Sequence, residues 1–290
     1  MCEFCTEHGE GKKWYLQMKN YSEELLHVEL TSRQKEIVEA ENRLEWNIRF
    51  FRDFVMPSIT GVAVRQEKQE VVPDKEKPSD SEIIQNNKID HFGQVLPIED
   101  VEKILDMVNS ITRMPCGCRF KTIGKTDKRY CFGLGIDKWG ILGKFPDSAS
   151  SLEVLDKQEA KNIIRKYDKE GLIHSVWTGV TPYIIGICNC DHDCLAYRGY
   201  IENGGLPIFF RAEYICEVDW ELCTGCKSCM TQCQFGAIFY SSTFSKVYIN
   251  PNKCFGCRLC RAACQNKAIR ILSRRKNPET ANILEPIAKK

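Results

Sequence analysis

The sequence lacks several features that mark common classes of protein. No apolar stretch approaches the length of about 18 residues that a membrane-spanning helix needs. The first ten residues, MCEFCTEHGE, have neither the basic nor the apolar region of a secretory signal peptide, so we expect a cytoplasmic protein. The formal net charge is only +2, from 41 basic and 39 acidic residues, which gives no overall field to attract nucleic acid or a membrane surface.

Motifs of common catalytic sites are missing as well. The segment GLGIDKWG contains glycines but lacks the strand–GxGxxG–helix context of a dinucleotide site. No nucleophile paired with a base, no glycine-rich phosphate loop and no carboxylate dyad is visible in the sequence. We therefore expect that any catalysis belongs to a partner subunit.

Cysteine, in contrast, is abundant, with 17 residues in a chain of 290. An odd number of cysteines spread over this length is not typical of the disulfide framework of a small secreted domain. Thiols that stay reduced in the cytoplasm and lie close together are candidate metal ligands. The sequence therefore predicts a metal-binding protein.

Apolar residues at helical spacing predict three helices. The first ends at Pro57 and presents one apolar face made of Ile37, Leu44, Ile48, Phe51 and Val55. The second and third are predicted over 97–110 and 155–171, with Gly171 as the stop of the third. Strands are predicted over 172–177 and 183–188. A helix followed by paired strands also fits a winged-helix unit, which would bind nucleic acid through residues 157–170.

The strongest pattern is a tandem cysteine repeat near the C-terminus. Residues 223–233 are CTGCKSCMTQC and residues 254–264 are CFGCRLCRAAC, so C-x2-C-x2-C-x3-C occurs twice with a period of 31 residues. Three thiolates at this spacing can surround one iron–sulfur cube, while the fourth points toward a second cube. Short predicted strands precede each first cysteine and follow each fourth one.

This repeat resembles the bacterial dicluster ferredoxins over about residues 211–273. The resemblance implies two [4Fe-4S] clusters in a pseudo-symmetric β-α-β fold. By position it assigns Cys223, Cys226, Cys229 and Cys264 to one cluster, and Cys254, Cys257, Cys260 and Cys233 to the other. The family usually has proline after each fourth cysteine, where this chain has Gln234 and Gln265; proline supplies no ligand there, so cluster binding is still expected. Zinc, which takes four ligands per ion, is the chemical alternative.

We therefore expect an α+β protein in several parts. They are a helical, cysteine-bearing N-terminal arm (1–70), a charged linker (71–94), a small α/β domain with C-x-C motifs (95–205), the dicluster ferredoxin domain (206–275) and a tail (276–290). The ferredoxin domain is the only one with a specific cofactor expectation at this point.

Nine cysteines remain outside the repeat. Cys216 stands alone and is most simply a buried strand residue. Six others occur in PCGC, in CNCDHDC and singly between them: Cys116, Cys118, Cys131, Cys188, Cys190 and Cys194. If both C-x-C pairs lay on strands, each pair would present its sulfurs on one face of a sheet and the pairs could form one ligand set.

The arrangement over about 95–200 resembles a domain of iron–sulfur proteins from anaerobic bacteria and archaea, in which the last element is often richer in cysteine. Asp191, His192 or Asp193 are therefore candidate replacement ligands. A third iron–sulfur cluster, zinc and unligated thiols remain alternatives for the six cysteines. Cys2 and Cys5 form a C-x2-C pair that could complete a metal site or lie near a partner.

Basic residues cluster between Cys118 and Cys131, at Arg119, Lys121, Lys125, Lys128 and Arg129, and again in RRK at 274–276. The simplest interpretation is a solvated basic loop. Cations beside an anionic cluster would also raise its reduction potential or dock an acidic redox partner.

These patterns favour an electron-transfer protein, a ferredoxin-like subunit of an anaerobic oxidoreductase complex whose partners are redox proteins. One alternative is a small reductase whose substrate meets a cluster near Cys188–Cys194. A second alternative is a redox-responsive nucleic-acid-binding regulator, although near-neutral charge makes nucleic acid an improbable partner.

Overall fold

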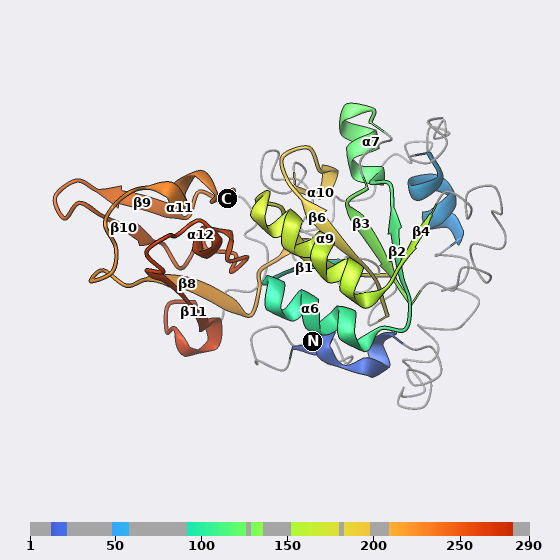
Figure 1. Cartoon of the computed structure of the whole chain (residues 1–290), viewed down its shortest axis with the longest axis horizontal. Coiled ribbons are helices and arrows are strands. Elements are labelled where there is room, and N and C mark those ends of the chain that lie inside the picture. Colours follow the sequence, from blue (N-terminus) through green and yellow to red (C-terminus); the bar gives the residue numbers. More distant parts are fainter. Residues whose placement is uncertain are drawn as a thin grey trace, which may run out of the picture.

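The computed structural model describes residues 13–21, 48–57, 92–125, 129–135, 152–179, 183–197 and 209–280. These residues form a seven-stranded mixed sheet with helices, followed by two small two-stranded sheets. Figure 1 shows the larger sheet at one end of the molecule and the C-terminal part, coloured orange to red, at the other. The predicted α+β class is confirmed. No described helix is both long and apolar enough to cross a membrane.

The seven strands lie in the order β4-β2-β3-β6-β5-β1-β7. Every neighbouring pair is antiparallel except β1 and β7, which are parallel. In chain order the strands are β1 (Gly93–Leu96), β2 (Ile111–Met114), β3 (Cys131–Leu134), β4 (Glu153–Leu155), β5 (Ile173–Thr178), β6 (Ile184–Cys190) and β7 (Phe209–Phe210).

Two long helices, α6 (Ile98–Met107) and α9 (Lys157–Lys169), lie side by side against this sheet (Figure 1). A capping box starts α9, because the Asp156 carboxylate accepts from the Glu159 backbone N–H at 2.8 Å and the Glu159 carboxylate accepts from the Asp156 N–H at 3.1 Å. Each helix buries an apolar stripe in the main core, so the second and third predicted helices are confirmed.

The described part of the N-terminal segment contains η1 (Trp14–Leu16), η2 (Met18–Tyr21) and the π-helical turn η3 (Phe51–Val55). The first two pack on the main core, whereas η3 forms a separate small cluster with Met114 and Leu152. Trp14 is buried and its indole N–H donates to the Gln94 side-chain oxygen at 2.6 Å. Gln94 belongs to β1, so the end of the range predicted as linker is a buried strand. Of the first predicted helix, residues 37–47 lie outside the described residues.

The winged-helix alternative does not describe this region. The strands that it required, β5 and β6, lie inside a sheet of seven strands. Its candidate recognition helix, α9, packs on the core and pairs with α6 through Arg165–Glu102 at 2.6 Å and Lys161–Asp106 at 2.5 Å.

The C-terminal part repeats one small unit. Strand β8 (Tyr214–Val218) pairs antiparallel with β11 (Ile269–Ser273), and β9 (Ile238–Ser241) pairs antiparallel with β10 (Lys246–Ile249). Short helices α11 (Ser228–Thr231) and α12 (Leu259–Ala262) follow the two cysteine loops, and the turn η6 (Arg274–Lys276) follows β11. The strands predicted around each cysteine run are therefore confirmed.

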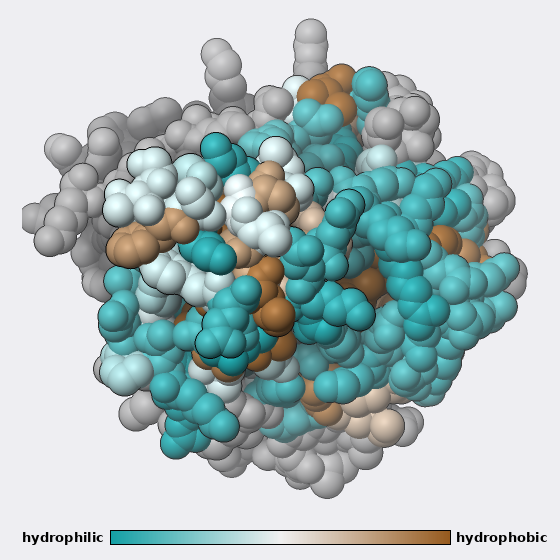
Figure 2. Space-filling view, turned by 60° about the vertical axis from the view of Figure 1, so that its left-hand side comes forward, coloured by the Kyte–Doolittle hydropathy of each residue, from teal (hydrophilic) through white to brown (hydrophobic). Residues whose placement is uncertain are grey.

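Among the described residues, most of the exposed large apolar side chains lie on this C-terminal part. Figure 2, which turns it forward, shows pale and brown patches within a largely hydrophilic face. The large apolar residues exposed there are Trp220, Leu222, Phe244 and Tyr248; among the described residues elsewhere, only Met18 and Val154 are comparably exposed.

Candidate metal centres

The two C-terminal cysteine loops have the same backbone conformation. Gly225 and Gly256 have φ values of 68° and 75°, and each lies so close to a carbonyl oxygen, of Ser245 or Tyr214, that a side chain would collide with it. Only glycine accepts this conformation at no steric cost. The 31-residue sequence repeat is therefore a repeat of chain geometry.

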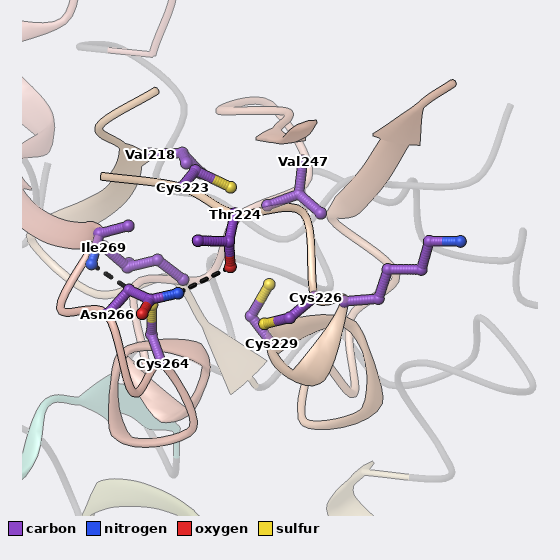
Figure 3. Close-up of a pocket in the computed structure, with 11 residues that line it drawn as sticks. Val218, Cys223, Thr224, Cys226, Cys229, Val247, Cys264, Asn266 and Ile269 are labelled. Atoms are coloured by element: carbon purple, nitrogen blue, oxygen red, sulfur yellow. Dashed lines mark hydrogen bonds between the residues drawn. The ribbon is translucent and has the colours of Figure 1, made fainter. Parts of the chain in front are cut away.

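Four predicted ligands of the first cluster line one pocket. Cys223, Cys226 and Cys229 come from the first repeat, and Cys264 comes from the end of the second. Figure 3 shows these four side chains around the pocket together with a hydrogen bond from the Asn266 amide to the Thr224 hydroxyl, at 2.7 Å, which joins the two repeats at its rim. A set of four thiols drawn from both repeats is the donor set that a [4Fe-4S] cluster requires.

The predicted ligands of the second cluster also lie close together. The pKa of the Cys257 thiol is raised well above its usual value, first by burial and then by the neighbouring Cys260, Cys254 and Cys233. These are the four cysteines assigned together from the sequence. Burial raises the pKa of Cys233 as well. Thiols in such surroundings are stable as thiolates only when a cation or metal compensates the charge.

Backbone N–H groups point at several of these sulfurs. Ala237 donates to Cys233 and Ala268 donates to Cys264, each at 3.3 Å and each four residues after its cysteine. Gly225 donates to Cys223 at 3.4 Å. Such bonds favour the thiolate form and, with a cluster bound, influence its reduction potential.

Cys216 has a role that the sequence did not indicate. As predicted, it is a buried strand residue, in β8. Its backbone N–H also donates to the Cys254 sulfur at 3.4 Å, and the hydrogen bond from its thiol is the main reason that the pKa of Cys254 falls to about 6. The contact joins residues 38 positions apart, so no local motif could have revealed it.

The six cysteines of the larger part come from three chain segments. Cys131 and Cys188 face each other across β3 and β6, with their sulfurs 4.0 Å apart. The Cys194 thiol donates to the Cys190 sulfur at 3.2 Å. Cys116 precedes α7 (Gly117–Ile123) and Cys118 lies within it, so the expectation that PCGC lies on a strand is wrong.

Nevertheless the six thiols form a closed ring of neighbours. The Cys116 thiol interacts with Cys118 and Cys131, which lowers its pKa, whereas hydrogen bonds with Cys116 and Cys194 raise the pKa of Cys118. Hydrogen bonds with Cys131 and Cys190 raise the pKa of Cys188. Each thiol interacts with the next one in the order Cys116, Cys131, Cys188, Cys190, Cys194 and Cys118, and Cys118 interacts with Cys116 to close the ring. We call this set the six-thiol ring.

Arg119 lies beside the ring and is not part of a solvated loop. Its side chain is 1% exposed, and its guanidinium donates to the Cys116 sulfur at 3.6 Å and to the Asn189 carbonyl at 3.2 Å. Burial disfavours the charged form, but Cys116 and Asp191 outweigh this effect and raise the pKa of Arg119. Asp191, a candidate replacement ligand, forms an ion pair with Arg119 at 2.8 Å. Arg274 in the RRK run is likewise fully buried.

Among the described residues, no three His, Cys, Asp or Glu side chains converge as they would around a single ion. This holds for the ring and for the eight repeat cysteines alike, and a cubane places each thiolate on its own iron atom. Cys2 and Cys5 lie outside the described residues.

Gln234 occupies a position where dicluster ferredoxins usually have proline. Its side-chain amide donates to the Gly171 carbonyl at 2.5 Å, and its backbone carbonyl accepts from the Tyr197 hydroxyl. Both partners belong to the larger part of the molecule. The departure from the family pattern therefore supplies a contact between the two parts.

Comparison with known proteins agrees with the geometry of the C-terminal part. Residues 222–268 match the family model of a 4Fe-4S dicluster domain, and such a domain implies two [4Fe-4S] clusters. The match does not extend to the seven-stranded sheet. No curated protein and no solved structure gives a significant match to the chain.

Proposed function

We propose that this chain is an iron–sulfur electron-transfer protein, a ferredoxin-like subunit or partner of an oxidoreductase complex. The observation that carries the proposal is the pocket lined by Cys223, Cys226, Cys229 and Cys264, because its ligands come from both repeats. Together with the dicluster-domain match, this pocket supports a first cluster held by these residues and a second held by Cys254, Cys257, Cys260 and Cys233. When bound, each cluster would accept and donate one electron at a time.

The protein's own residues would hold and tune these clusters. Backbone N–H groups of Ala237, Ala268 and Gly225 stabilise negative charge on three of the ligand sulfurs. Arg274 lies near the second ligand set, and its guanidinium donates to the Cys254 carbonyl at 2.6 Å. Positive charge and hydrogen-bond donors near a cluster favour its reduced state.

Electrons would enter or leave at the first cluster. Cys226 is the one exposed thiol among the described cysteines, so this ligand set is the closer of the two to the surface. The exposed apolar residues of the C-terminal part lie on the same domain, and the rings of Trp220 and Phe244 stand 5.4 Å apart. Exposed aromatic residues are typical of protein interfaces. We propose that a redox protein docks there (Figure 2).

The test replaces one ligand of each proposed cluster in protein purified without oxygen. Cys226→Ser should lower the iron content by about four atoms and remove the [4Fe-4S] signal of the first cluster on reduction, and Cys257→Ser should do the same for the second cluster. The two variants are matched controls, since each removes one thiol. Wild-type protein with about four irons or fewer, or with stoichiometric zinc in the repeat, would contradict the proposal.

A further inference from the structure

We propose that the six-thiol ring is a third metal centre, an iron–sulfur cluster located beside the second cluster site. The evidence for a metal site is the arrangement of the six thiols. The role of this site in electron transfer rests on the proposed function.

The ring is assembled by rigid secondary structure. Cys131, Cys188 and Cys190 lie on the paired central strands β3 and β6, while Cys116, Cys118 and Cys194 begin or precede helices at one end of those strands. Helices α7 and α10 (Leu195–Tyr197), which carry two of these segments, also contact each other. Three chain segments therefore converge on one point.

Neither disulfides nor ordinary core packing explain the ring. The sulfur–sulfur distances of 4.0 Å between Cys131 and Cys188 and 3.2 Å between Cys190 and Cys194 are far from a bond of about 2.05 Å. A core position needs only volume, which valine or alanine would fill without the oxidation that threatens adjacent thiols. Six cysteines, each next to two others, are instead a concentrated set of soft ligands, which select iron–sulfur clusters, zinc or Cu(I).

The charge next to the ring favours an anionic occupant. The Arg119 guanidinium is buried, donates to a ring sulfur and forms an ion pair with Asp191. A buried cation needs negative charge around it, and cluster-bound thiolates would provide this at the Cys116 side. Six thiols exceed the four ligands of a zinc ion and of a [4Fe-4S] cluster alike. The iron–sulfur assignment therefore rests on the neighbouring ligand set, because Cys257 packs against the apolar cluster that contains Cys190 and Cys194.

An apolar cluster links the ring to the second cluster site. Cys190 and Cys194 belong to this cluster, and Cys257 packs against it from the dicluster domain. Tyr197 lies three residues after Cys194, and its ring centroid is 6.0 Å from that of Phe235. The Phe235 ring stacks on the Phe255 ring with their centroids 4.0 Å apart. Phe235 and Phe255 follow the ligands Cys233 and Cys254 closely in the chain. The path from the ring therefore leads to the second ligand set, and from there to the exposed first set.

The experiment uses the full chain, purified anaerobically and analysed for iron, sulfide and zinc. Wild-type protein should hold about twelve irons. The double variant Cys188→Ser/Cys190→Ser, which removes two ring thiols, should retain about eight irons. The double variant Cys226→Ser/Cys257→Ser, which removes one ligand of each repeat cluster, should retain about four irons and a cluster absorption band. Ile163→Ser, which changes a partly buried residue of α9 outside the ring and outside both repeat ligand sets, is the control and should keep about twelve.

Each outcome decides the inference. The third cluster would be ruled out if wild-type protein held about eight irons and the double variant Cys226→Ser/Cys257→Ser held none. That result would leave the proposed function intact. Stoichiometric zinc that is lost only from the double variant Cys188→Ser/Cys190→Ser would overturn the iron–sulfur assignment. If that variant fails to fold, as judged by circular dichroism, retention of about four irons in Cys226→Ser, Cys257→Ser still tests the ring. Loss of all iron there contradicts the third cluster.

A second readout tests where the ring lies relative to the other centres. In fully reduced protein, paramagnetic resonance should show the third cluster coupled to its nearest neighbour. Cys257→Ser should abolish that coupling, while Cys226→Ser should leave it. The reverse result would contradict the path through Phe235 and Phe255.

Discussion

At the scale of single residues, groups that never bind iron decide how the ligand sulfurs behave. Cys216 is such a group, because its N–H and its thiol both interact with Cys254. A hydrogen bond to a ligand sulfur stabilises the more negative, reduced cluster. Removing the thiol should therefore lower the reduction potential of the second cluster.

We expect Cys216→Ala to lower that potential by roughly 40 mV, because a hydrogen bond of about 1 kcal/mol corresponds to this shift for one electron. A redox titration followed by paramagnetic resonance would measure the potential. Cys216→Ser keeps a donor and should stay near the wild-type value. An equal shift in both variants would attribute the effect to packing, and an unchanged potential in Cys216→Ala would contradict the role of the thiol.

At the scale of elements, the cysteine loops depend on their glycines. Gly256 combines a positive φ with close contact to the Tyr214 carbonyl, whereas Gly236 has a φ of 60° and open space around it. Gly256→Ala should therefore cost about 2–5 kcal/mol from collision and strain together, and Gly236→Ala about 1–2 kcal/mol from strain alone.

Thermal unfolding of anaerobic protein would compare the two glycine variants, with iron content as a second readout. Gly256→Ala should unfold at the lower temperature and lose iron from the second site first, because the loop carries Cys254 and Cys257. Equal midpoints for both variants would show that the Tyr214 carbonyl yields to the added methyl group.

At the scale of the whole molecule, Asp100 joins three distant segments. Its buried carboxylate accepts from the Tyr15 hydroxyl at 2.9 Å and the Tyr214 hydroxyl at 2.8 Å, and pairs with Lys103 at 3.2 Å. These partners belong to the N-terminal segment, β8 and α6. The carboxylate therefore fixes the two parts of the molecule to each other.

Asp100→Ala should destabilise the protein by about 3–5 kcal/mol, because it leaves buried hydroxyls and a lysine without their acceptor. Denaturation followed by tryptophan fluorescence would measure the loss, since Trp14 is buried nearby. Asp106→Ala removes an exposed pairing with Lys161 and should cost no more than about 1 kcal/mol. A similar small effect at Asp100 would mean that the carboxylate does not hold the parts together.

Elements that depend on neighbouring residues could be predicted from the sequence alone. The C-x2-C-x2-C-x3-C repeat, its flanking strands and the two helices over 97–110 and 155–171 all follow from spacing, since each depends on neighbours within a few residues. The grouping of eight cysteines into two ligand sets is a prediction implied by the resemblance of this repeat to dicluster ferredoxins.

Features that depend on residues far apart in the chain, namely the sheet pairings, the ring and the buried arginines, became visible only in the tertiary structure. The seven-stranded sheet arises from pairings such as β1 with β5, about 80 residues apart, which no local period specifies. The closure of the six-thiol ring required a helix at PCGC where alternation favoured a strand, and the burial of Arg119 and Arg274 required anions and carbonyls from elsewhere in the chain. Charge and spacing predict the chemistry of a side chain, but only packing decides whether water or another residue compensates it.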